Sequence, residues 1–192
     1  MDTVRWLQQA VLFLHVVAFA VALSAVLRED AAIVRARRVD ARRLDEAAAT
    51  LGRSLAVLWA SGLVLVGFDV GLDLQALLAK PKLIAKLAVV TALTCNGLAL
   101  HALVLPVLRR PPSGGIRPPA LPLILGAIST ASWLYASFIG ISRLVAPWMR
   151  LVDFLWIYAV LLAGAIAVAL LVVRPRMAWA RSSAAASATA AA

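Results

Sequence analysis

Residues 6–27 read WLQQAVLFLHVVAFAVALSAVL, a run that contains no Asp, Glu, Lys or Arg. About 20 apolar residues in a helix are enough to cross the hydrocarbon core of a bilayer. Four further stretches have this length and character, at 51–70, 83–108, 121–141 and 152–173. The chain is 64% hydrophobic, well above the roughly 45–50% typical of a soluble domain. The sequence therefore predicts an all-α, polytopic membrane bundle of five transmembrane helices.

Five helices of this length use most of the 192 residues, so residues 1–181 are predicted to form a single transmembrane domain. The connection at 31–49 is rich in helix-forming Ala, Arg, Leu and Glu and lacks Gly and Pro, which predicts helical extensions of the first two spans. The segment 111–119, PPSGGIRPP, is typical of a loop. The final residues, 182–192, form a Ser/Ala low-complexity tail that we expect to be disordered.

Basic residues are distributed unequally between the two ends of the predicted helices. Of the 19 Lys and Arg residues, 13 lie in the first connection, the third connection and the tail, and six lie at the opposite ends. Because Lys and Arg are retained on the cytoplasmic side, the N-terminus is predicted outside and the C-terminus in the cytoplasm. The net charge of +10 then reflects contact with the lipid bilayer and its anionic lipids, and no nucleic-acid partner is expected.

The chain has two histidines, His15 and His101, and each lies inside an apolar span. An ionisable side chain in hydrocarbon is costly and marks a candidate functional site. Imidazole is also a frequent ligand of iron and copper. Both residues are therefore candidate cofactor-binding and metal-binding residues, and one haem between the first and third spans would use them as axial ligands. The alternative is that each imidazole is neutral and bonded to a Ser, a Thr or a backbone carbonyl.

Charged and polar residues near these spans are candidates for supporting roles. Asp69 and Lys86 lie at the predicted outer surface, where an ion pair between them is expected. Thr94 shares a helix face with Gly97 and His101 because residues three or four apart align on one face.

The fourth span carries two rows of residues at helical spacing. Ser132, Ala136 and Gly140 form a row of small residues, which is typical of close helix packing in lipid. Ser129, Trp133 and Ser137 form a second, more polar row that is predicted to line a shallow cavity. Trp59 and Trp133 lie deep within their spans, and we expect them to pack between helices.

Three short sequences carry a resemblance to known proteins: LHVVA at 14–18, PKLIAKL at 81–87 and NGLALH at 96–101. Together they resemble a group of small bacterial inner-membrane proteins. The resemblance extends distantly to the copper-resistance protein D family and the bacterial membrane protoporphyrinogen oxidase family. It covers mainly the first and third spans, and the fourth more weakly at 126–140. It implies a bacterial inner (plasma) membrane location and haem, porphyrin or copper chemistry. His15 matches the first-helix histidine, Lys86 matches a third-helix lysine, and Asn96 belongs to the polar stretch before His101.

The leading functional hypothesis is a haem-associated redox or porphyrin-related membrane protein that holds haem b. The alternatives are an accessory protein for copper transport or resistance, and a non-catalytic subunit that binds a partner. An electron-transfer or membrane protein is the expected partner. The sequence contains no catalytic triad, P-loop, dinucleotide fingerprint or CxxC motif, so the catalytic residues and the reaction remain open.

The topology can be tested with reporter fusions. A reporter that is active only in the cytoplasm should be active when fused after Arg181, and a reporter that is active only outside should be active when fused near Ala79. These results are expected from the 13-to-6 distribution of basic residues. Activity of the outside-only reporter at the C-terminus would contradict the five-span topology.

Overall fold

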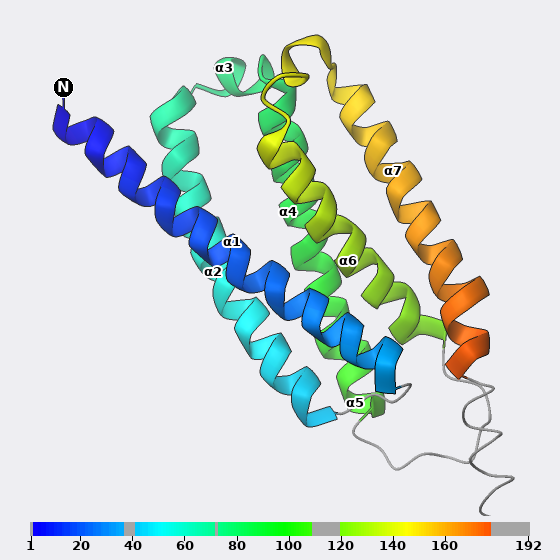
Figure 1. The fold of residues 1–192 in the computed structure, drawn as a ribbon. Coiled ribbons are helices and arrows are strands. Elements are labelled where there is room, and N and C mark those ends of the chain that lie inside the picture. The colour runs from blue at the N-terminus through cyan, green and yellow to red at the C-terminus, as the bar shows by residue number, and fades with distance from the viewer. Residues whose placement is uncertain (1, 37–40, 72, 109–119, 178–192) are drawn as a thin grey trace, which may run out of the picture.

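The computed structural model describes residues 2–36, 41–71, 73–108 and 120–177. The predicted loop at 111–119 and the predicted tail at 182–192 lie outside these residues. The described part of the chain is helical and contains no strand (Figure 1). Its elements, in chain order, are α1 Asp2–Ala36, α2 Ala41–Val70, α3 Leu74–Leu78, α4 Pro81–Ala99, η1 Leu100–Val104, α5 Leu105–Leu108, α6 Ala120–Ile141, η2 Ala146–Trp148, α7 Leu151–Val168 and η3 Ala169–Val173.

Five segments of the described chain are long and apolar enough to cross a membrane, which confirms the predicted number of spans. They are Thr3–Ala32, Asp45–Val70, Pro81–Val104, Ala120–Ile141 and Leu151–Met177. The helices α1 and α2 continue beyond their apolar parts toward each other. The helical extensions predicted within 31–49 are therefore confirmed for the described residues.

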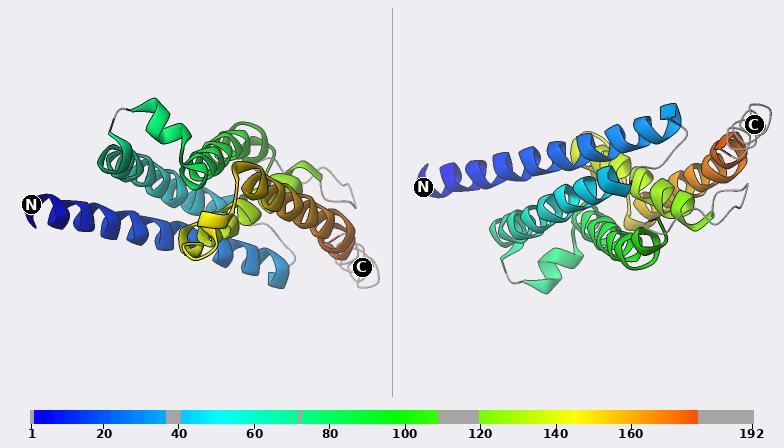
Figure 2. Two further views of the ribbon diagram at one scale, coloured as in Figure 1. Left: turned by 90° about the horizontal axis from the view of Figure 1, so that it is seen from above. Right: turned by 90° about the horizontal axis from the view of Figure 1, so that it is seen from below.

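The helices form two neighbouring groups that meet at α6. Helix α1 packs along α2, while α4 and α7 pack on α6. Helix α6 also contacts α1, so it joins the two groups. The N-terminal part of α1 extends away from the other helices, and α7 lies on the far side of the bundle from that end (Figure 2). The short helix α3 lies at the same end of the bundle as the N-terminus (Figure 1).

The interior is narrow and is made largely of small and aromatic side chains. On α1, Ala18 and Ala22 are buried one turn apart, which lets the neighbouring helices approach closely. On α6, Trp133 and Tyr135 are buried, and Phe154 of α7 is fully buried against them. Many large apolar side chains lie outside this core. In water such a surface would be a liability, whereas in a bilayer it is the surface expected to contact lipid.

Hydrogen bonds between side chains connect α6 to its neighbours. The Tyr135 hydroxyl donates to the Phe154 carbonyl of α7 at 2.5 Å, and the hydroxyls of Ser132 and Tyr158 are 2.7 Å apart. The rings of Tyr135 and Tyr158 stack with centroids 5.1 Å apart. On the side facing α1, the Thr130 hydroxyl donates to the Asp30 carboxylate at 2.5 Å.

Two spans end in a widened helical turn that precedes a proline. The Leu105 N–H donates to the Leu100 carbonyl, and the Arg174 N–H donates to the Ala169 carbonyl, five residues back in each case. Pro106 and Pro175 follow directly. A proline ring clashes with the carbonyl four residues before it, and a π-helical turn is one way to relieve that clash within a continuous helix.

The predicted row of small residues on α6 is confirmed at one end and wrong at the other. Ser132 is fully buried against Tyr158 of α7. Ala136 is partly buried against the core. Gly140 is exposed, and a methyl group added there would meet no atom within 4 Å. Gly140 therefore does not face a closely packed helix, because α6 has no near neighbour on that side at this level.

Because Ser132 is buried and Gly140 is exposed, we expect a larger side chain to destabilise the protein at position 132 and to be tolerated at position 140. Ser132→Leu should destabilise the detergent-solubilised protein by about 1–3 kcal/mol, because the larger side chain overpacks the contact with Tyr158. Gly140→Leu should leave thermal stability nearly unchanged. Size-exclusion chromatography after a temperature series measures both. Equal losses for the two variants would show that the Gly140 face is packed after all.

Candidate functional site

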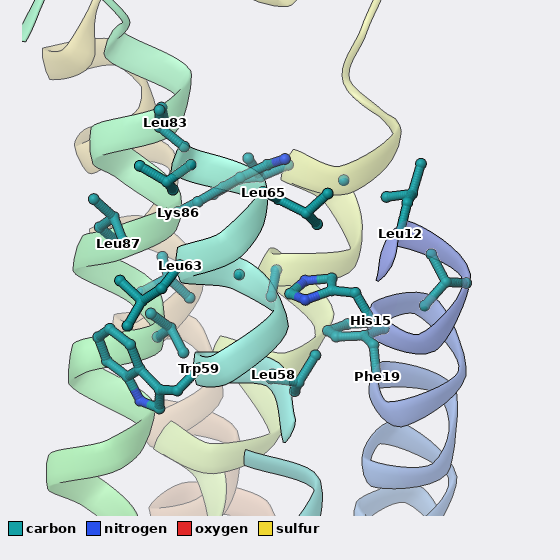
Figure 3. A pocket seen from close by; sticks show the side chains of 18 of the residues that line it. Leu12, His15, Phe19, Leu58, Trp59, Leu63, Leu65, Leu83, Lys86 and Leu87 are labelled. Atoms are coloured by element: carbon teal, nitrogen blue, oxygen red, sulfur yellow. The ribbon is translucent and has the colours of Figure 1, made fainter. Parts of the chain in front are cut away.

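A cavity of about 900 Å³ lies between α1, α2, α4 and α6. Cavities that bind small molecules and cofactors are typically about 300–1,000 Å³ and mostly apolar, with a few polar groups that orient the ligand. The lining here is mostly Leu, Val and Ile with aromatic side chains, and a few polar groups project among them (Figure 3). The cavity therefore has the size and composition of a ligand site.

The polar and aromatic groups occupy different levels of this cavity. Arg5, Asp69 and Lys86 line it at the end nearest α3. Phe19 and Trp59 line it further along their helices. Trp59 is ten residues before Asp69 on α2, which is about 15 Å along the axis. The cavity thus has a charged mouth and an aromatic interior, and His15 lies between the two levels on α1.

His15 is held by a hydrogen bond to Ser61 of α2. Its Nδ1 atom is 2.8 Å from the Ser61 hydroxyl oxygen on α2. The same hydroxyl donates its only hydrogen to the Val57 carbonyl at 2.6 Å. When the hydroxyl donates to this carbonyl it accepts from His15, and this arrangement corresponds to a neutral imidazole with its proton on Nδ1. The Nε2 atom then keeps a free lone pair, which is the form needed to bind a metal or accept a proton.

The His15 imidazole lies beside Gly62 of α2. A methyl group added at Gly62 would lie 3.5 Å from the His15 Cε1 atom, at ordinary contact distance. The imidazole therefore rests against the α2 backbone at Gly62 and projects from α1 into the space between the helices (Figure 3). Side chains larger than alanine at this position would compete with the ring for the same space.

The prediction of an ion pair between Asp69 and Lys86 is wrong, because the Asp69 carboxylate is paired with Lys80 instead. The Lys80 Nζ atom lies 2.6 Å from Asp69 Oδ1 and 3.2 Å from the Asp69 carbonyl oxygen. The turn that includes α3 returns the chain so that Lys80 faces the end of α2. Within the described residues, Lys86 has no hydrogen bond and no ion pair, although it lines the cavity.

The aromatic side chains of the lining are held by contact with one another and by a hydrogen bond to α4. The rings of Phe19 and Trp133 pack with centroids 5.4 Å apart at an interplanar angle of 54°. Trp59 donates from its indole N–H to the Thr94 hydroxyl at 3.0 Å. Both tryptophans pack between helices, as expected, and they also line the cavity. Trp133 and Ser137 of the predicted polar row line it as well, while Ser129 does not.

The remaining predicted site residues lie apart from the cavity. His101 is exposed, within the widened turn η1, and is not among the cavity residues. Thr94 bonds to Trp59, and the Asn96 side-chain N–H donates to the Leu125 carbonyl of α6 at 3.1 Å. These two residues hold α4 against α2 and α6. The described residues include no cluster of three or more His, Cys, Asp or Glu that could hold a metal ion.

The structure thus brings together His15, Lys86 and Asp69 and adds Ser61 and Arg5, which the sequence analysis did not single out. A signal for Ser61 exists, because it is a polar residue beside a glycine within the apolar run of α2. The Asp30–Thr130 bond was also not anticipated. No protein-family model, curated protein or solved structure matches this chain, so the resemblance described above stays a prediction.

The His15–Ser61 bond makes a spectroscopic prediction. In protein labelled with ¹⁵N-histidine, the His15 imidazole should be in the Nδ1–H tautomer at neutral pH. Ser61→Ala removes the acceptor and should shift the population toward the Nε2–H tautomer, which is the ordinary preference in water. Solid-state NMR of the His101→Gln background isolates the single remaining ring. An unchanged tautomer in Ser61→Ala would contradict the assignment.

Proposed function

We propose that this chain is a multi-pass protein of a bacterial inner membrane that binds haem b in the cavity, with His15 as an axial ligand. The observation that carries the proposal is the hydrogen bond between His15 Nδ1 and the Ser61 hydroxyl beside the cavity. A Ser61 acceptor on Nδ1 leaves the Nε2 lone pair available in an aromatic cavity of about 900 Å³. A hydrogen bond that fixes and polarises a ligating imidazole is a regular feature of metal-bound histidines.

The other residues of the cavity fit the same group. The apolar and aromatic walls match a flat apolar ring system, and the Lys86 and Arg5 side chains are suited to carboxylates at its edge. When bound, haem b would supply one-electron redox chemistry. The protein residues would orient the ring, exclude water from its faces and hold the proton on His15 Nδ1. An electron-transfer or membrane protein remains the expected partner.

A single protein ligand is the arrangement we favour. The two-histidine hypothesis requires His101 to reach the same cavity, and His101 is exposed outside its lining. Copper transport, the other hypothesis from the sequence, calls for several His, Cys or Met side chains converging on one ion. No observation on the described residues favours that alternative.

The proposed orientation has the N-terminus outside and the C-terminus in the cytoplasm. It rests on the unequal distribution of basic residues. The charged residues of the cavity lining lie near the beginning of α1, the end of α2 and the beginning of α4. The N-terminus and α3 lie at the same end of the bundle (Figure 1). In this orientation the mouth faces the outer surface of the membrane.

The visible spectrum of the purified protein tests the proposal. Protein expressed with haem supplementation should show a Soret band, and His15→Ala should abolish or shift that band. His101→Ala is the matched control and should keep it, because His101 lies outside the cavity. Wild-type protein without a Soret band would overturn the haem proposal, and loss of the band in His101→Ala would restore the two-histidine arrangement.

A further inference from the structure

Lys86 is a cation without a partner inside a membrane-spanning helix. It lies five residues after Pro81, the first residue of α4, which is about 7.5 Å along the helix axis. Asp69 is near enough to attract its charge, but no side chain of the described residues forms a hydrogen bond or an ion pair with it. Asp69, the acidic residue of the cavity lining, is already paired with Lys80 at 2.6 Å. A lysine at this depth is costly unless it meets a negative group or reaches the interface.

A second basic residue, Arg5 of α1, is exposed and also belongs to the cavity lining. Lys86 extends from α4 toward the space that His15 also faces (Figure 3). With Asp69 paired to Lys80, the charged mouth of the cavity has an excess of positive charge. Below it the lining is apolar and aromatic. The cavity therefore matches a molecule that has an anionic end and an apolar body.

We infer that Lys86 forms an anion subsite that binds a carboxylate or phosphate carried by an amphipathic ligand of the cavity. For haem b the anions are the ring carboxylates, an identification that rests on the proposed function. A phospholipid headgroup offers the same chemistry, with the acyl chains in the apolar interior. Charge-assisted hydrogen bonds to Lys and Arg are the strong, orienting contacts for such groups.

The experiment compares a free-base porphyrin dicarboxylate, protoporphyrin IX, with its dimethyl ester. Neither contains iron, so binding does not require His15 as a ligand. Quenching of tryptophan fluorescence reports binding, because Trp59 and Trp133 line the cavity. Wild-type protein should bind the dicarboxylate roughly tenfold or more tightly than the ester, the size expected for one charged hydrogen bond.

Three variants assign that preference to Lys86. Lys86→Met should lose the preference for the dicarboxylate and bind the ester as before, whereas Lys86→Arg should retain the preference. Lys82→Met controls for the loss of a nearby positive charge, because Lys82 lies one turn away on α4, acts on Lys86 electrostatically and is not part of the lining. An unchanged preference in Lys86→Met would overturn the subsite and indicate that Lys86 only extends to the interface.

A lipid measurement separates this inference from the haem proposal. Phosphatidylglycerol that co-purifies with each variant is quantified by mass spectrometry. One outcome is that wild type binds neither porphyrin and that only Lys86→Met loses phosphatidylglycerol. This outcome would support the subsite with a lipid occupant and count against haem. Equal binding of the two porphyrins, or no porphyrin binding and no lipid difference between variants, would overturn the subsite.

Discussion

Helices in a bilayer gain little from hydrophobic contact with one another, because lipid chains are as apolar as their side chains. This constraint makes the few polar contacts between helices important. Four pairs of helices each contain one: His15–Ser61 joins α1 to α2, Trp59–Thr94 joins α2 to α4, Asn96 joins α4 to Leu125 of α6, and Tyr135 joins α6 to the Phe154 carbonyl of α7. Together with buried small residues, they set the relative rotation of the helices.

The cavity lies along the part of α1 that, among the described residues, forms no hydrogen bond with α6. Helix α1 meets α6 at the Asp30–Thr130 bond, near its C-terminal end. Toward its N-terminus α1 stays close to α2 through His15 and Ser61 but extends away from the other helices (Figure 2). The space left between them is the cavity. The exposed Gly140 lines this space, which explains why a small residue there has no helix against it.

Much of the fold could be predicted because length and apolarity are local properties of the sequence. His15 and Lys86 were recognisable for the same reason, since an ionisable residue stands out in an apolar run. The contacts that these two side chains make could not be recognised from the sequence. The Ser61 contact depends on how α1 and α2 are rotated, and the choice of Lys80 over Lys86 for Asp69 depends on the turn containing α3. The row of small residues on α6 identified a face that can pack against a helix. The path of α1 determines which part of that face is covered.

The widened turn before Pro106 also changes the helical register of the third span. One additional residue in a turn rotates the following residues by about 100° relative to a regular α-helix. The face of α4 that contacts α6 at Asn96 is therefore not continued in regular α-helical register through η1. His101 lies within the widened turn η1, which precedes Pro106. Its exposed position is therefore a consequence of the same turn that accommodates the proline. Deleting one residue from 100–104 would cancel this offset and realign the end of the span with α4.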